Sequence, residues 1–174
     1  MCWTWWMWSY EIEEIFMNIK AIVNLYNKII EYMGIPHSLF LLAIRAYWGW
    51  LFFQAGFGKF THIERTTQFF GSLGLPSPEI MAYFIATVET VGGILLFLGL
   101  ASRLTGLVLA GNMIGAFLVA HREALFHIIS KPDDFYMALP FSFLFASLVI
   151  LFCGGGMFSL DYLIKKFLFE RNKP

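Results

Sequence analysis

Residues 80–121 read IMAYFIATVETVGGILLFLGLASRLTGLVLAGNMIGAFLVAH, and this stretch decides the fold class. Its only residues of the Asp, Glu, Lys or Arg types are Glu89 and Arg103. A helix needs about 20 predominantly apolar residues to cross roughly 30 Å of hydrocarbon, and helices of soluble proteins do not sustain such runs. The stretch therefore predicts two membrane-spanning helices, over about 80–102 and 104–121, joined by a tight turn at Arg103.

Two more apolar runs flank this pair of predicted spans. One covers about 38–58 and contains one charge, Arg45, and the other lies inside 135–160, which has no charged residue. The composition agrees, because the 174 residues are 59% hydrophobic and 14% charged, whereas a soluble domain carries about 25% charged residues. We therefore expect an all-α integral membrane protein built as a bundle of four transmembrane helices.

The residues before the first span form two further segments. Residues 18–34 repeat apolar side chains at helical spacing with polar side chains between them, which predicts an amphipathic interfacial helix. Gly34 and Pro36 are expected to end it. Residues 1–17 hold four tryptophans and three glutamates. This segment is either an aromatic anchor at the lipid headgroups or a translation of upstream sequence, with Met17 as the true start.

An ordered set of short motifs accompanies the spans. They are GFGK at 56–59, GLPSP at 74–78, ETVGGILLFLGLASR at 89–103 and GGGMFSLD at 154–161. Over residues 38–163 this succession resembles the DoxX family of small bacterial membrane proteins, which implies a place in the bacterial cytoplasmic (inner) membrane. The motif residues carried over by the resemblance are Gly56, Gly92, Gly93, Arg103, Ser159 and Asp161.

The resemblance also implies a class of function. The DoxX family is associated with quinol oxidase and thiosulfate:quinone oxidoreductase systems, so we expect an accessory subunit of a quinone-linked oxidoreductase with protein partners in a membrane redox complex. No C-x-x-C motif, nucleotide-binding loop or catalytic triad is present, and no covalently bound cofactor is expected. Quinone or a partner protein would have to hold the electrons. The alternatives are a non-catalytic membrane scaffold and, less favoured, a small-solute carrier.

Glu89 is the strongest candidate for a functional residue. An ionisable group inside a span is costly and is usually paired or functional. Ala86 and Gly93 share its helical face, and small residues mark helix contacts in lipid, so Glu89 should face the bundle. Arg45, on the antiparallel first span, is its expected partner. The pair would be an architectural salt bridge, or Glu89 would handle protons while Arg45 holds an anion or a quinone oxygen.

Two weaker candidates lie near the opposite end of the first span from Arg45. Lys59 should reach the outer surface, about 21 Å from Arg45 along the helix axis, as an interfacial lysine or as an attractor of an anionic substrate. His121, at the same level, is a weaker anion-binding candidate. No metal site is expected, because His121 and His127, six residues apart, fall on different faces of a helix.

The third predicted span also carries a packing motif. Gly111 and Gly115 form G-x-x-x-G, which favours close approach of a neighbouring helix. Asn112 lies between them and needs a hydrogen-bond partner inside the bundle.

The distribution of lysine and arginine predicts the orientation in the membrane. Seven of these residues fall on the side of the two termini, and four fall on the other side. Cytoplasmic segments carry the excess of such residues, so both termini are expected in the cytoplasm, with 164–174 as a basic tail. The zero net charge gives no basic field for a nucleic acid partner.

This orientation can be tested by cysteine labelling of intact cells. A cysteine at Lys131 should react with a membrane-impermeant reagent, and a cysteine at Lys165 should not, because the charge bias places the first outside and the second in the cytoplasm. Labelling at 165 but not at 131 would show that the orientation is the opposite of the predicted one.

Overall fold

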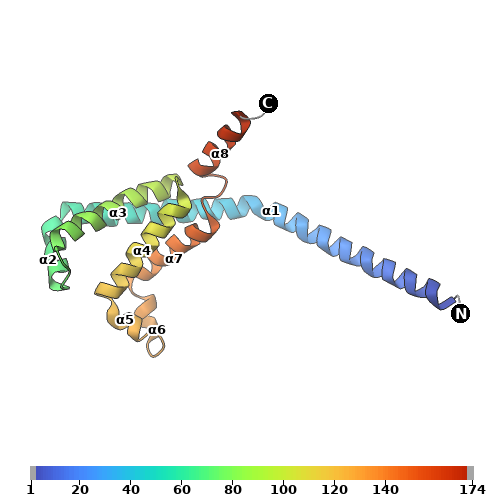
Figure 1. The fold of residues 1–174 in the computed structure, drawn as a ribbon, viewed down its shortest axis with the longest axis horizontal. Coiled ribbons are helices and arrows are strands. Elements are labelled where there is room, and N and C mark those ends of the chain that lie inside the picture. The colour runs from blue at the N-terminus through green and yellow to red at the C-terminus, as the bar shows by residue number, and fades with distance from the viewer. Residues whose placement is uncertain (1–2, 172–174) are drawn as a thin grey trace. The chain divides into compact units, whose positions relative to one another are not determined.

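The computed structural model describes the backbone of residues 3–171 and the side chains of residues 19–20, 22–28, 32 and 34–168 (Figure 1). Throughout this part of the chain the secondary structure is helical, with eight α-helices and no strand. The chain divides into two units, Met1–His37 and Ser38–Pro174. The predicted all-α class is confirmed.

The first unit consists of the beginning of helix α1 (Trp3–Thr61). The helix continues through Gly34 and Pro36, so the predicted end at these residues is wrong. Proline removes one intrahelical hydrogen bond but does not prevent a helix from continuing at a kink. The apolar and polar side chains described between residues 19 and 28 are exposed. An interfacial position for this helix stays a prediction, and the aromatic anchor at residues 1–17 lies outside the described side chains.

Three helical segments of the described chain are long and apolar enough to cross a membrane. They are Gly34–Thr61 of α1, α3 (Pro78–Leu98) and α4 (Ser102–Ala120). The fourth apolar helix, α7 (Leu139–Cys153), has 15 residues, which rise about 22 Å at 1.5 Å per residue. The predicted count of four spans is therefore not confirmed. Pro140 lies in the first turn of α7, and Gly154, at φ +77°, ends it, so the apolar run 135–160 is only partly helical.

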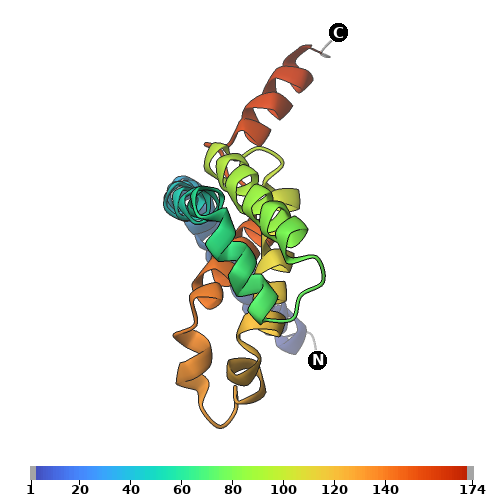
Figure 2. The same ribbon diagram turned by 90° about the vertical axis from the view of Figure 1, so that its left-hand side faces the viewer.

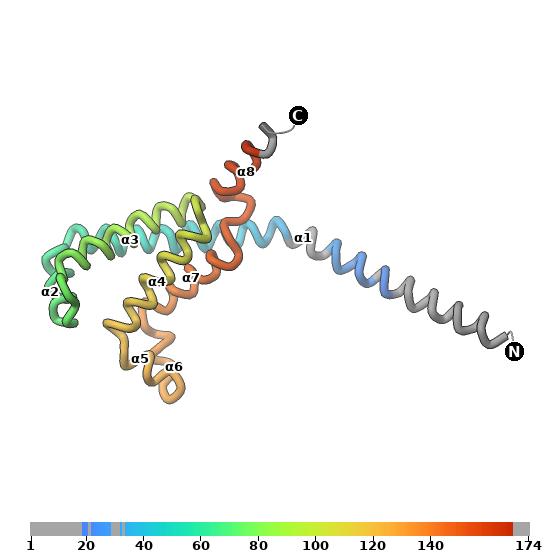
Figure 3. Tube along the Cα trace, viewed as in Figure 1, coloured from blue at the N-terminus to red at the C-terminus, as the bar shows by residue number. Residues whose placement is uncertain are grey.

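Shorter helices connect these segments. Helix α2 (Ile63–Ser72) follows α1 and packs against α3. Helices α5 (Arg122–Phe126) and α6 (Pro132–Tyr136) join α4 to α7 at one end of that pair (Figure 2). Helix α8 (Leu160–Arg171) comes last, after the glycine loop that ends α7. Figure 3 follows the same path as a tube along the chain.

Helices α1 and α3 touch backbone to backbone through glycine. A Cβ atom added to Gly93 would lie 2.5 Å from the amide nitrogen of Phe53, and one added to Gly49 would lie 2.8 Å from that of Phe97. Two turns beyond Gly49, Gly56 lies as closely against Ala86 and Thr90 of α3. In lipid, where apolar surface gains nothing by leaving the solvent, such close packing holds helices together.

Helix α4 packs closely against both α7 and α3. Gly106 lies against the backbone of Ser147 and Leu151 in α7, and Gly92 of α3 lies against the side chain of Leu109. Figure 1 shows α4 beside α7 and α3 beside the C-terminal part of α1. The buried apolar core of the second unit fills the space between these helices, with Leu41, Phe52, Leu96, Leu109, Met113 and Ile150.

The predicted packing role of Gly111 and Gly115 is wrong. A Cβ atom at either position would meet no neighbouring atom within 4 Å, leaving out the chain neighbours and the backbone of the helix itself. The reason is the orientation of α4, whose buried face carries Gly106, Ala110, Met113 and Phe117. Gly111 and Gly115 instead line an open cavity.

Candidate functional site

The second unit contains a cavity of about 670 Å³ between α1, α2, α3, α4 and α7. Small-molecule sites in proteins typically measure about 300–1,000 Å³ and place a few polar groups in an apolar wall. This cavity follows that pattern, because apolar side chains and glycine form the wall apart from four polar residues. Those four are Lys59, Glu89, Asn112 and His121.

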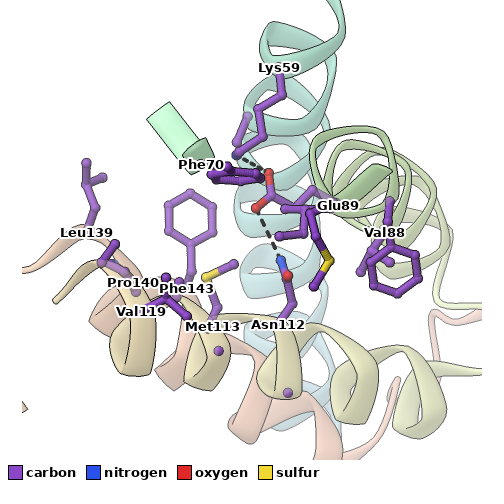
Figure 4. Close-up of a pocket in the computed structure, with 18 of the residues that line it drawn as sticks. Lys59, Phe70, Val88, Glu89, Asn112, Met113, Val119, Leu139, Pro140 and Phe143 are labelled. Atoms are coloured by element: carbon purple, nitrogen blue, oxygen red, sulfur yellow. Dashed lines mark hydrogen bonds and ion pairs between the residues drawn. The ribbon is translucent and has the colours of Figure 1, made fainter. Parts of the chain in front are cut away.

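Glu89 lies at the centre of the polar part of the wall (Figure 4). One carboxylate oxygen forms an ion pair with the ammonium group of Lys59, and the other accepts a hydrogen bond of 3.2 Å from the Asn112 side-chain amide. Glu89 is 4% exposed. The predictions that Glu89 faces the bundle and that Asn112 has a partner there are confirmed.

Arg45 does not pair with Glu89, so that prediction is wrong. Aligning the centres of the two predicted spans misplaces α1 against α3 by about five residues, or roughly 7 Å at 1.5 Å per residue. The glycine contacts set the true register, with Gly49 against Gly93 and Gly56 against Ala86 and Thr90. This brings Lys59, rather than Arg45, within reach of Glu89, and the Lys59 ammonium turns inward instead of out to the surface.

Arg45 lies in a second polar cluster, at the other end of α3. Its side chain is fully buried, and Nη2 donates a 3.0 Å hydrogen bond to the carbonyl oxygen of Phe158. Within the described part of the chain, Nε and Nη1 have no hydrogen-bond partner. The guanidinium lies so close to Gly99 that a Cβ atom there would come within 1.5 Å of Nη1. Glycine at 99 is therefore a condition for burying Arg45.

Asp161 closes this cluster by capping α4. Its two carboxylate oxygens accept hydrogen bonds of 2.7 Å each from the backbone N–H groups of Ala101 and Ser102. Burial raises the pKa of Asp161, but these backbone hydrogen bonds and the charge of Lys165 outweigh burial and hold its pKa below the ordinary value. A negative charge at the start of a helix is also favoured by the helix dipole.

The same carboxylate stabilises a strained turn between α3 and α4. Gly99, at φ +70°, ends α3, and the N–H groups of Gly99 and Leu100 bond back to Leu96 and Leu95, respectively. Ala101 follows at φ +48°, a left-handed conformation that costs a residue with a Cβ about 1–2 kcal/mol. The hydrogen bond from Ala101 to Asp161 offsets part of that cost.

The remaining motif residues take structural positions. Ser159 is buried, donates a 2.7 Å hydrogen bond to the carbonyl of Gly156, and accepts one from the N–H of Tyr162. Arg103 is exposed in the first turn of α4. The GGGMFSLD segment therefore ends α7, starts α8 and ties both to the turn between α3 and α4.

His121 joins the cavity at the far end of α4. It is the residue at which that helix ends, and its ring meets the Phe117 ring edge-on, with 6.1 Å between centroids. The sequence did not reveal that α2 and α7 form walls of the same cavity. It did indicate that Asn112 is special, because Asn112 is the only amide side chain in residues 80–121.

The comparisons with known proteins agree with the motif succession. Residues 40–122 match the DoxX family model. The resemblance is thereby confirmed over α2, α3, α4 and the end of α1, and this DoxX-like region contains the four polar residues of the cavity. The match stops before the GGGMFSLD segment, whose resemblance rests on the motif alone.

One curated relative carries a functional description. The chain is 47% identical over 85 residues to the Bacillus subtilis (strain 168) protein named "Putative oxidoreductase CatD". That alignment covers 49% of this chain and 62% of the relative, so the chain spans less than two thirds of the relative's length. No solved structure gives a significant match.

The pairing of Lys59 with Glu89 can be tested by removing one or both charges. Lys59→Met should lower the unfolding free energy by on the order of 3 kcal/mol, because it strands a buried carboxylate. The double variant Lys59→Met/Glu89→Leu should recover most of the loss, and Lys131→Met, at an exposed loop position, should be near neutral. Thermal melting in mild detergent measures each variant. If Arg45→Met instead restored the stability lost in Glu89→Leu, the pairing of Arg45 with Glu89 would be supported after all.

The cap formed by Asp161 should make stability depend on pH. A carboxylate with a lowered folded-state pKa stabilises the fold above its ordinary pKa of 3.8, and the contribution disappears as pH falls through the folded value. The melting temperature of Asp161→Asn should therefore lie below that of the parent by a constant difference near neutral pH, and this difference should shrink below about pH 4. Exposed Asp134→Asn is the control. A melting-temperature difference that grows on acidification would refute this role.

Proposed function

We propose that this chain is a membrane-embedded accessory subunit of a quinone-linked oxidoreductase system, and that its cavity receives the quinone ring. The observation that carries the proposal is a buried carboxylate on the wall of a largely apolar cavity of ligand size. Ionisable groups at such positions in membrane proteins mark substrate and proton pathways. The word "oxidoreductase" in the relative's name supports the same class.

The groups around Glu89 suit the two oxygens of a quinone. The Lys59 ammonium carries three N–H donors, of which the pair with Glu89 needs one. Another can donate to a quinone carbonyl oxygen. Asn112 holds Glu89 in place through its amide hydrogen bond, so the carboxyl group keeps one orientation towards the cavity.

Reduction of a quinone to a quinol consumes two electrons and two protons. In this proposal the electrons come from the partner oxidoreductase, because the sequence contains no motif for a redox centre. Glu89 delivers each proton to a quinone oxygen and takes up the next one through the side of Lys59, whose side chain is 28% exposed. A positioned proton donor typically contributes about 10²–10⁴-fold to a rate.

The proposal predicts that Glu89→Gln stops quinone reduction without unfolding the protein. The amide keeps the shape and the hydrogen bonding of the carboxyl group but cannot transfer a proton. Quinone reduction by membranes carrying the variant should fall at least about 10²-fold, with assembly of the complex checked in parallel. Glu79→Gln is the matched control, because Glu79 is exposed in the first turn of the same helix.

Two other outcomes would count against this function. Full activity of an assembled Glu89→Gln complex would leave Glu89 as an architectural residue. Loss of partners from Arg65→Ala, a variant at an exposed position of α2, together with an active Glu89→Gln complex, would favour the membrane scaffold.

A further inference from the structure

The cavity reaches the surface of the bundle between α3 and α4. Its wall includes Phe84 of α3, 61% exposed, and Val108 of α4, 48% exposed. Gly111, one turn beyond Val108, is also exposed. At the inner end Glu89 and Phe52 are buried. The cavity therefore runs from an apolar mouth on the outside of the bundle to a polar group inside it.

The surface around the mouth is one that meets lipid. Both α3 and α4 belong to the helices long and apolar enough to cross a membrane. Large apolar side chains stand exposed on the two helices next to the mouth, among them Tyr83, Val91, Leu107, Ile114 and Leu118. Such side chains face hydrocarbon in a membrane protein. A molecule passing through this mouth would come from the lipid phase.

Aromatic and aliphatic side chains also line the cavity on the side of α2 and α7. Helix α2 contributes Phe69, 52% exposed, and Phe70, 8% exposed, and Leu73 follows the end of that helix. Leu139, Pro140 and Phe143 of α7 continue that wall (Figure 4). This apolar lining suits a lipid-soluble ring.

Gly111 and Gly115 keep the path along α4 open. Glycine inside a helix costs roughly 1 kcal/mol relative to alanine, and at Gly49, Gly56, Gly92, Gly93 and Gly106 close packing explains it. At 111 and 115 no neighbour lies within 4 Å of an added Cβ atom, and both residues line the cavity. The missing side chains leave space beside the inner polar group.

We propose that the ligand is an amphiphile that enters from the lipid phase between α3 and α4, places its polar ring at Glu89 and Lys59, and leaves its apolar tail over Gly111 and Gly115. This inference rests on the proposed function and narrows its ligand to a tailed quinone. A cavity of about 670 Å³ holds a ring and the first part of a tail. A long polyprenyl chain would have to continue through the mouth into lipid.

The test compares a benzoquinone without a tail and the same ring with a decyl tail. Each is titrated into the purified full chain in lipid nanodiscs, and quenching of tryptophan fluorescence reports binding. Trp48 is a suitable reporter, because its ring lies 5.2 Å from that of Phe143 in the cavity wall. The parent should bind both compounds, and the decyl compound should bind more tightly.

Gly111→Leu fills the mouth and should separate the two ligands. It should weaken binding of the decyl compound at least tenfold and change binding of the tail-less ring by less than threefold. Gly58→Leu is the control, because Gly58 also has no neighbour within 4 Å of an added Cβ and does not line the cavity. Gly115→Ala repeats the test with a smaller change, should Gly111→Leu fail to fold.

The outcomes distinguish this inference from the function on which it rests. Binding of neither quinone to the parent would overturn the proposed quinone site and the entrance with it. Binding of both to the parent, with equal affinity losses or none in Gly111→Leu and Gly115→Ala, would overturn only the entrance between α3 and α4.

Discussion

The backbone contact between α1 and α3 sets the positions of both polar clusters. Gly49 and Gly56 of α1 lie directly against α3, and helices this close cannot slide past each other without steric overlap. In that register Lys59 reaches Glu89, and Arg45 lies over Gly99. A shift by one helical turn, about 5.4 Å, would leave two buried charges without their present partners.

The two clusters differ in what surrounds them. At one end of α3, the Phe158 carbonyl and the Gly99 backbone lie close around Arg45. Both carboxylate oxygens of Asp161 accept backbone hydrogen bonds at the start of α4. At the other end, Glu89 adjoins an open cavity. The first arrangement joins α8 to the turn between α3 and α4. The second combines space with an ionisable group, so it is the better candidate for chemistry.

The sequence was sufficient for features that depend on local composition. Hydropathy predicted the three long spans, and the single acid in residues 80–102 predicted a buried Glu89. It was insufficient where the answer depended on register or on termination of helices. Arg45 and Lys59 are equally plausible partners for Glu89 until the α1–α3 contact is known. Gly106 and Gly111 look alike in the sequence, yet one touches α7 and the other lines a cavity.

The corrected partner of Glu89 changes the chemistry open to it. Arginine holds a carboxylate in a planar fork and keeps its proton in proteins, whereas lysine is a point charge with three rotatable N–H groups and a pKa that responds to its surroundings. An Arg45–Glu89 pair would therefore have fixed both charges permanently. A Lys59–Glu89 pair can rotate an N–H towards a ligand oxygen, while Asn112 keeps the carboxyl group oriented. Under the proposed function, lysine at 59 is thus a working part of the site, and its replacement by arginine should preserve the fold better than the proton transfer.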